Sequence, residues 1–395
     1  MTQAELCYDF CVPPRIVFGW GRRREVGQLG RTLGRRALLI SGLPAEIAAK
    51  TLGEIREALG AQNVDSVLLG TLAHEPEVDD VDRLALELRG YGASPGDFLL
   101  GVGGGAALDL AKAAAAMATN RHSRTVADYL EGVGRGLKIS EPPLPVLAMP
   151  TTAGTGAEAT RNAVISCYDP PFKKSLRDER LLPRIALVDP ELGVTAPPAV
   201  TAASGIDAIT QLIESYISRN ARPIPQALAV QGLRSGLGAI FQAVENGRSR
   251  PAREQMAHAA LLSGMALANS GLGLAHGVAA ALGIHNRVPH GLACAVMLPA
   301  ALRLNCQVRQ AELAHLARQV LDLPPTIPAA EAAQTLIAEI EALCRRVGVP
   351  SRLGQLGVGR EQIPELVRSA RGTSMSANPR DVSDEELSRL LEEML

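Results

Sequence analysis

The sequence predicts an N-terminal α/β domain, built on a doubly wound, Rossmann-like parallel sheet, followed by a C-terminal all-helical domain. Apolar runs of strand length alternate with amphipathic helical segments through the first 187 residues, a pattern typical of parallel sheets. One of those runs leads directly into three consecutive glycines. After residue 188 the strand patterns stop and alanine- and leucine-rich helical segments follow. We therefore place the two domains at residues 1-187 and 188-395.

The first domain is expected to alternate strands with helices. Strands are predicted at residues 15–19, 37–42, 64–69, 97–103 and 145–150, and helices at 22–33, 45–59, 78–91 and 106–116. Strands connected in this way lie parallel, so ligand sites are expected beyond the carboxyl ends of the strands.

The second domain is expected to contain helices only. Amphipathic segments span residues 205–218, 225–246, 253–268, 291–304, 311–321, 329–347 and 383–393. The last of them begins with Ser383 and Glu386, a capping box that marks a helix N-terminus.

Composition narrows the class of protein. The 395 residues are 47% hydrophobic, which suffices for two cores. Forty basic and 41 acidic residues nearly cancel, so nucleic acid is not an expected partner. The six cysteines lack CxxC spacing and the N-terminus lacks the pattern of a signal peptide, so we expect a cytoplasmic protein.

Residues 261–284 carry no full charge and are long enough to span a membrane. Their serine, asparagine, histidine and glycine residues favour a buried helix pair instead, and no membrane partner is expected.

The glycine run Gly103-Gly104-Gly105 follows a predicted strand and precedes a predicted helix. A backbone without Cβ atoms can approach a pyrophosphate closely, and the N-terminus of the helix offers unpaired N–H groups. The run matches neither GxGxxG nor a Walker loop, and a tight structural turn is about as common an explanation. A phosphate cradle and a turn both remain open from this motif alone.

A second loop of similar character follows the predicted strand 145–150. It contains Thr151, Thr152 and Thr155 among glycines, and these hydroxyls could contact the phosphates or ribose of a nucleotide. A cluster of helix caps and turns would have the same composition. Two such loops in one sheet favour a nucleotide-binding domain.

The helical domain contains residues suited to binding a divalent metal. Asp207 and Gln211 are four residues apart and therefore on one helix face. His276 lies in the uncharged segment, and His290 follows Pro289 at a predicted helix start. A single buried histidine or aspartate is usually a satisfied core residue. Several ligand types in one domain beside a nucleotide site favour a metal centre.

Three motifs resemble those of one known family. They are residues 103–112, residues 150–158 and Pro289-His290-Gly291, and they resemble the iron-containing (group III) alcohol dehydrogenases, in the superfamily of glycerol dehydrogenase and dehydroquinate synthase. The resemblance extends along nearly the whole chain. It implies hydride transfer between NAD(P) and a small alcohol or aldehyde, a metal (Fe²⁺ or Zn²⁺) that acts as a Lewis acid, and a homodimer.

The resemblance also implies roles for individual residues. The cofactor would be bound by Gly42, Gly103, Gly104, Gly105, Ala106, Asp109, Thr151, Thr152, Thr155 and Lys173. The metal would be bound by Asp207, Gln211, His276 and His290, of which Asp207, His276 and His290 are the expected catalytic residues. Ser41-Gly42 stands where many NAD-preferring members have an aspartate that binds the ribose 2′-OH, so NADP is a candidate cofactor beside NAD.

Two positions depart from the family pattern. Gln211 offers an amide oxygen where the family has a histidine, which should weaken metal binding. Ala280 stands where many members place a proton-relaying histidine, and His285 is the nearest candidate to replace it. The departures keep three alternatives open: a reductase of maleylacetate type that works without metal, a lyase like dehydroquinate synthase, and a catalytically silent NAD(P)-binding homologue.

Overall fold

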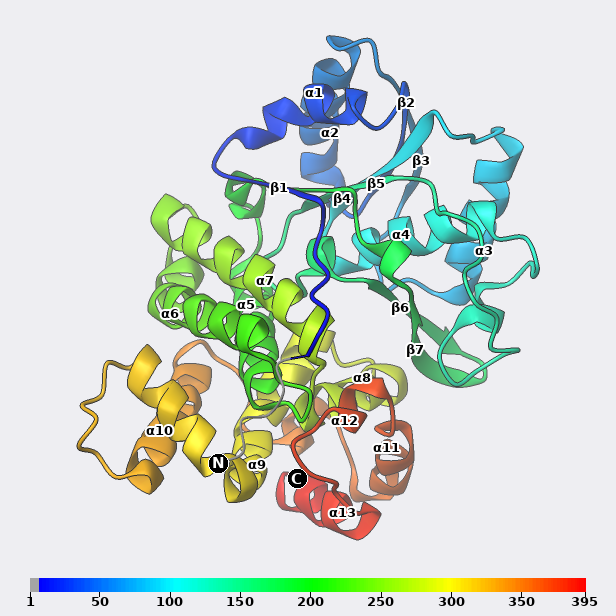
Figure 1. Ribbon diagram of the computed structural model, residues 1–395. Coiled ribbons are helices and arrows are strands. Elements are labelled where there is room, and N and C mark those ends of the chain that lie inside the picture. Colours follow the sequence, from blue (N-terminus) through cyan, green and yellow to red (C-terminus); the bar gives the residue numbers. More distant parts are fainter. Residues whose placement is uncertain (1–6) are drawn as a thin grey trace.

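The computed structural model describes residues 7–395 and contains a six-stranded parallel sheet in its N-terminal half (Figure 1). The strand order is β1-β8-β5-β4-β2-β3, and every neighbouring pair is parallel. The strands are β1 (Arg15–Phe18), β2 (Arg36–Ser41), β3 (Asp65–Thr71), β4 (Asp97–Gly103), β5 (Val146–Pro150) and β8 (Ile185–Val188). The chain reverses its direction of travel across the sheet between β2 and β4.

Helices cover both faces of this sheet, which confirms the doubly wound fold. On β2, Leu38 and Ile40 pack in the cluster that contains α3 and α4, whereas Ala37 and Leu39 pack in the cluster that contains α1 and α2. The alternation follows from the strand, in which successive side chains point to opposite faces. The helices are α1 (Val26–Arg31), α2 (Ala45–Gly60), α3 (Val78–Gly90) and α4 (Gly105–Thr119).

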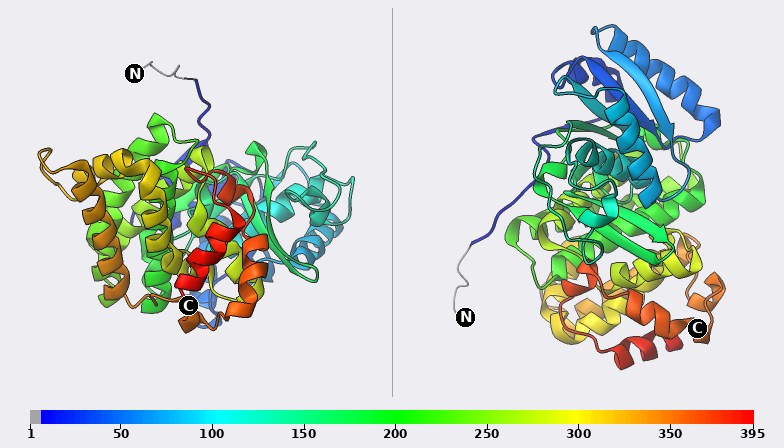
Figure 2. Two further views of the ribbon diagram at one scale, coloured as in Figure 1. Left: turned by 90° about the horizontal axis from the view of Figure 1, so that it is seen from below. Right: turned by 90° about the vertical axis from the view of Figure 1, so that its right-hand side faces the viewer.

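The C-terminal half is helical, as predicted, and lies below the sheet in Figure 1 and in the right-hand view of Figure 2. Its core is one continuous apolar cluster to which α5, α6, α7, α8, α9 and α10 all contribute. The helices are α5 (Pro198–Ile217), α6 (Pro223–Glu245), α7 (Arg250–Ser270), α8 (Leu274–Asn286), α9 (His290–Val320), α10 (Ala329–Arg346), α11 (Ile363–Ser369), α12 (Thr373–Ser376) and α13 (Asp384–Glu393). Ser383 caps α13 by accepting a hydrogen bond from the N–H of Glu386. This is one half of the predicted capping box, since the Glu386 carboxylate pairs with Arg380 instead.

Several elements differ from the sequence prediction. An antiparallel hairpin of β6 (Asn162–Tyr168) and β7 (Pro171–Arg177) was not expected, because β7 has a largely polar sequence without the alternation of a half-buried strand. One helix, α9, replaces two predicted ones and is interrupted only by a kink at Arg309 (φ −126°, ψ 28°). The short α11 and α12 also carried no clear pattern.

The apolar stretch 261–284 forms parts of α7 and α8, which meet at an angle of 102°. This confirms the predicted helix pair. By length and composition α9 could cross a membrane, but 67% of its apolar window is buried inside the protein. A core helix of a large helical domain has the same composition.

Candidate active site

A cavity of about 790 Å³ lies beyond the carboxyl ends of β2, β4 and β5, where the chain reverses direction in the sheet. This is the position at which doubly wound folds bind nucleotides. The predicted cofactor residues that line it are Gly42, Gly104, Ala106, Thr151 and Thr152.

Glycines permit the close packing of this site. A Cβ atom on Gly103 would lie 2.9 Å from the backbone nitrogen of Gly42, and a Cβ atom on Gly105 would lie 2.5 Å from Oγ1 of Thr155. The two loops that the sequence singled out are therefore in contact. Gly104 precedes α4 and provides no side-chain cap. The first N–H groups of α4 thus remain available to bind a phosphate.

A second cavity of about 140 Å³, here called the inner cleft, adjoins the first and shares Glu75, Ala106 and His290 with it. Predicted cofactor and metal residues line it together: Gly105, Ala106, Asp109, Thr155, Lys173, Gln211, His276 and His290. A third cavity of about 440 Å³ shares Lys173, His276 and His290 with it and also contains Ala280. His290 lines all three cavities, so the structure places this imidazole where the nucleotide cavity meets the inner cleft.

Asp109 and Lys173 line the cleft, but both side chains have partners within the protein. The Asp109 carboxylate accepts a hydrogen bond from the N–H of Val164 at 3.0 Å and pairs with Lys112 Nζ at 2.8 Å. Lys173 Nζ lies 2.6 Å from a carboxylate oxygen of Glu75. Burial opposes ionisation of Glu75, but the charge of Lys173 outweighs it and lowers the pKa of this carboxyl. The sequence analysis missed Glu75, which lies in no motif.

Three predicted metal ligands lie together, and a cysteine joins them. Asp207 Oδ1 is 3.2 Å from His276 Nε2 and 3.9 Å from His290 Nε2. Cys294 Sγ is 3.7 Å from His290 Nε2. The ligand atoms of these four residues all lie within 4.8 Å of one another. Metal–ligand bonds of about 2.0–2.3 Å place tetrahedral ligands roughly 3.5 Å apart, so the group fits a divalent cation with little adjustment.

Glu214 holds His276 in position. Its carboxylate lies 2.7 Å from His276 Nδ1 and accepts hydrogen bonds from the N–H groups of Gly273 (2.9 Å) and Ala275 (2.7 Å) at the start of α8. His276 Nε2 is thereby directed at Asp207. A carboxylate behind a ligating histidine is a common arrangement in metal sites. The sequence analysis missed Glu214, although it lies seven residues after Asp207 on the same face of an apolar helix.

Gln211 lines the inner cavity, but its amide oxygen already has a partner. Ser263 Oγ lies 2.7 Å from Gln211 Oε1, and both residues are buried. The sequence analysis placed Gln211 among the metal ligands, and that assignment stays a prediction.

The electrostatics of the cluster suit a cation. Burial disfavours the ionised carboxylate, but the hydrogen bond to His276 and the charge of that imidazole lower the pKa of Asp207. Burial also opposes protonation of His276, yet Cys294, Asp207 and Glu214 together raise the pKa of this imidazole well above its usual value. Burial and the charge of Lys173 lower the pKa of His290 to about 4. Asp207 is thus ionised and His290 neutral at pH 7, as metal ligands must be, whereas His276 has to release its proton when it binds a metal.

His285 does not replace the missing relay histidine. Its Nε2 lies 2.7 Å from Ser369 Oγ, and within residues 7–395 it lines none of the three cavities. Ala280 does line the third cavity, beside His276. His285 therefore does not itself face the metal cluster and connects to the third cavity through Ser369, which lines it.

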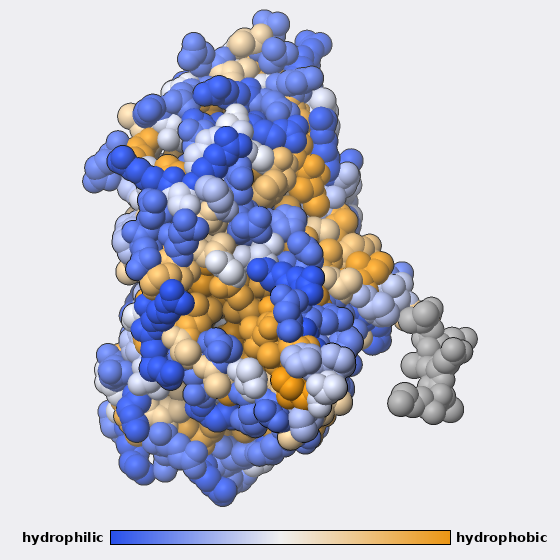
Figure 3. All heavy atoms as spheres, turned by 90° about the vertical axis from the view of Figure 1, so that its left-hand side faces the viewer, coloured by the Kyte–Doolittle hydropathy of each residue, from blue (hydrophilic) through white to orange (hydrophobic). Residues whose placement is uncertain are grey.

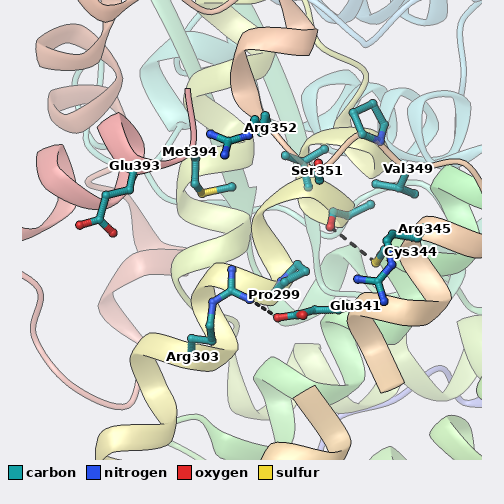
Figure 4. A pocket seen from close by; sticks show the side chains of 13 residues that line it. Pro299, Arg303, Glu341, Cys344, Arg345, Val349, Ser351, Arg352, Glu393 and Met394 are labelled. Atoms are coloured by element: carbon teal, nitrogen blue, oxygen red, sulfur yellow. Dashed lines mark hydrogen bonds and ion pairs between the residues drawn. The ribbon is translucent and has the colours of Figure 1, made fainter. Parts of the chain in front are cut away.

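A separate pocket of about 310 Å³ lies between α9, α10 and the C-terminal end of the chain. Figure 4 shows the Arg303–Glu341 ion pair and Cys344 on its walls. The predicted site residues are not part of its lining as described, so we treat it as distinct from the active site.

Comparison with known proteins agrees with this geometry. Residues 13–190 match the family model "Iron-containing alcohol dehydrogenase", and residues 201–395 match "Fe-containing alcohol dehydrogenase family, C-terminal". The NAD-dependent methanol dehydrogenase of Bacillus methanolicus is 31% identical over 98% of this chain and 100% of its own. The lactaldehyde reductase of Escherichia coli K12 is 35% identical over 94% of this chain and 96% of its own. The crystal structure of a 1,3-propanediol oxidoreductase superposes with a TM-score of 0.90 at 31% identity, covering 98% of this chain and 100% of the other.

Proposed function

Because the chain belongs to the iron-containing alcohol dehydrogenase family, we propose that it interconverts a small alcohol and its aldehyde on a metal bound by Asp207, His276 and His290. The observation that carries this proposal is the shared position of His290, which lines both the nucleotide cavity and the inner cleft, where His276 of the metal cluster also forms part of the wall. A substrate in that cleft would contact the cluster and the cofactor at once, which is what hydride transfer requires.

The residues of the site bind the metal and the cofactor and orient the substrate between them. When bound, the metal supplies Lewis-acid polarisation of the substrate oxygen, and the nicotinamide carries the hydride. Asp207 contributes the negative charge that offsets a divalent cation, and Glu214 fixes the ring of His276 through Nδ1. The N-terminus of α4 and the adjoining glycines hold the cofactor diphosphate. The donors of the site are mostly buried, which limits their contact with bulk water.

A small substrate is supported by the size of the cleft and by the relatives. The inner cavity measures about 140 Å³, and the third cavity, which shares His276 and His290 with it, measures about 440 Å³, near the lower end of the range of about 300–1,000 Å³ that is usual for ligand sites. The relatives named above carry methanol, lactaldehyde and 1,3-propanediol in their names. We propose a short-chain alcohol or aldehyde for this enzyme.

We further propose that the enzyme accepts NADPH as well as NADH. Gly42 leaves the end of β2 without the carboxylate that would repel a 2′-phosphate. Among the described residues that line the nucleotide cavity, Glu75 is the only acidic one, and it is paired with Lys173. Neither form of the cofactor meets an unpaired negative charge.

A homodimer, a cytoplasmic location and a domain boundary at residue 187/188 complete the proposal. Strand β1 lies at an edge of the sheet, and edge strands need a cover or a partner. Figure 3 shows apolar side chains gathered in the middle of one face, as is common where subunits associate.

All six cysteines, which fall within the described part of the chain, are free thiols. The sheet ends at Val188 and the long helices begin at Pro198.

Oxidation of NADH and NADPH over a panel of short aldehydes tests the proposed function. We expect turnover with both cofactors and loss of turnover when the metal is removed. Cofactor binding without turnover of any aldehyde or alcohol would favour the silent homologue. Full turnover in metal-free protein would favour the metal-independent reductase.

A further inference from the structure

We infer that Cys294 is the fourth protein ligand of the metal and takes the place that the sequence pattern assigns to Gln211. The inference rests on the proposed metal site and adds a ligand to it. It changes the expected ligand set from three strong donors and an amide to one carboxylate, two imidazoles and a thiolate.

The position of Cys294 carries the inference. The sulfur lies 3.7 Å from His290 Nε2, and it stays within 4.8 Å of the ligand atoms of Asp207 and His276. These are separations that a single tetrahedral cation can bridge, since its ligands lie roughly 3.5 Å apart. Cys294 follows His290 by four residues on α9, so the helix presents both side chains on one face.

The chemistry of the donors favours sulfur over the amide. Thiolate is a strong ligand for Zn²⁺ and other borderline-soft cations, whereas an uncharged amide oxygen is a weak one. A cation bound to the thiol replaces its proton, which leaves to solvent. Gln211 Oε1 is occupied by Ser263 Oγ at 2.7 Å, so the amide would have to give up part of this contact to bind a metal.

Cys294 and His290 differ in burial, which places them on different sides of the proposed metal. Cys294 is fully buried, whereas the side chain of His290 is 28% exposed toward the cleft. A metal bound here would have the sulfur on its inner side and the cleft on its outer side. Substrate can therefore approach from the cleft as a fifth ligand without displacing Cys294, since a catalytic zinc can expand from four to five ligands.

Cobalt substitution tests the inference with a readout that does not depend on activity. Thiolate bound to Co²⁺ produces an intense near-ultraviolet charge-transfer absorption that carboxylate, imidazole and amide ligands do not. We expect this band in the Co²⁺-loaded native protein and in Gln211→Ala, and its loss in Cys294→Ser. Cys306→Ser is the matched control, because Cys306 is also a buried cysteine on α9 but lies outside the cluster, and it should keep the band. X-ray absorption of the zinc form should show one sulfur at about 2.3 Å.

Metal affinity gives an independent measurement. We expect Cys294→Ser to weaken zinc binding more than about tenfold, a loss at least as large as that of an outer-shell partner, while circular dichroism confirms that the variant is folded. Cobalt bound to the native protein without the charge-transfer band would overturn the inference and leave the proposed function intact. If neither metal binds the native protein at all, the proposed metal function fails together with it. The variant Asp207→Asn, which should bind neither metal tightly, shows that any bound metal occupies this site.

Discussion

Replacement of Glu214 with glutamine removes the negative charge and one acceptor oxygen from the group that positions His276. The native carboxylate accepts from two backbone N–H groups and lies 2.7 Å from His276 Nδ1, and its side chain is only 3% exposed. One of its oxygens faces the N–H of Ala275, and the other faces both Gly273 and His276. The amide of a glutamine can replace only one of these oxygens, because its NH₂ group meets donors at the other.

The size of the effect follows from those contacts. Hydrogen bonds to a charged group contribute about 1.5–3 kcal/mol each. Glutamine loses one acceptor contact if its NH₂ group faces Ala275 and two if it faces Gly273 and His276, so the free energy of unfolding should fall by about 1.5–6 kcal/mol. This is a large part of a total that is typically about 5–15 kcal/mol. The loss of ring orientation should also weaken metal binding by about 10–100-fold, as outer-shell substitutions do.

Denaturant unfolding of the metal-free protein and zinc titration against a competing chelator measure the two effects. The matched control is Glu254→Gln on α7, where an exposed pair with Arg250 is lost and the change should stay within about 0.5 kcal/mol. Native-like stability and native zinc affinity in Glu214→Gln would refute the positioning role.

Three further predictions concern catalysis, pH and the cofactor. His276→Ala should reduce turnover at least about a hundredfold. His285→Ala should leave it nearly unchanged, since His285, in the part of the chain that the structure describes, lines none of the three cavities of the site. Steady-state kinetics with one aldehyde compares the two variants, and equal losses would contradict the assigned site. Burial raises the pKa of Glu158 from 4.5 to about 7, so its protonation stabilises the folded state fully below pH 4.5, and this contribution of about 3 kcal/mol is lost as pH rises through 7. Glu158→Gln should therefore flatten the dependence of the unfolding free energy on pH between 4.5 and 7, which urea unfolding across that range measures; an unchanged slope would exclude this carboxyl as its source. Gly105→Ala should weaken NADH binding more than about tenfold, because the new Cβ would lie 2.5 Å from Oγ1 of Thr155 and separate the two phosphate loops. Fluorescence titration with NADH measures this affinity. A native affinity in the variant would show that cofactor binding does not need the close contact between the loops.

The sequence was sufficient to predict the architecture where local patterns are strong. Strands such as Asp97–Gly103 are fully buried runs, and helices such as Ala329–Arg346 are strongly amphipathic. The hairpin of β6 and β7 escaped prediction because its second strand is polar and is defined by pairing with the first. The merger of two predicted helices into α9 depends on packing against the rest of the helical core rather than on a local signal.

The candidate site was predictable only in part, for a related reason. Asp207, His276 and His290 belong to motifs, and the structure brings them together. Glu214 and Cys294 belong to the same cluster but acquire their roles from the crossing of α5, α8 and α9. The one sequence signal for these residues was helical spacing, because Glu214 follows Asp207 by seven residues and Cys294 follows His290 by four.

The most direct test of the account is elemental analysis of protein purified without chelator, together with NADH and NADPH oxidation before metal removal, after it, and after restoration with Zn²⁺ or Fe²⁺. The account predicts close to one metal per chain in the native protein, near-zero metal in Asp207→Asn, and turnover that disappears and returns with the metal. Undiminished turnover in native protein that contains no metal would contradict it.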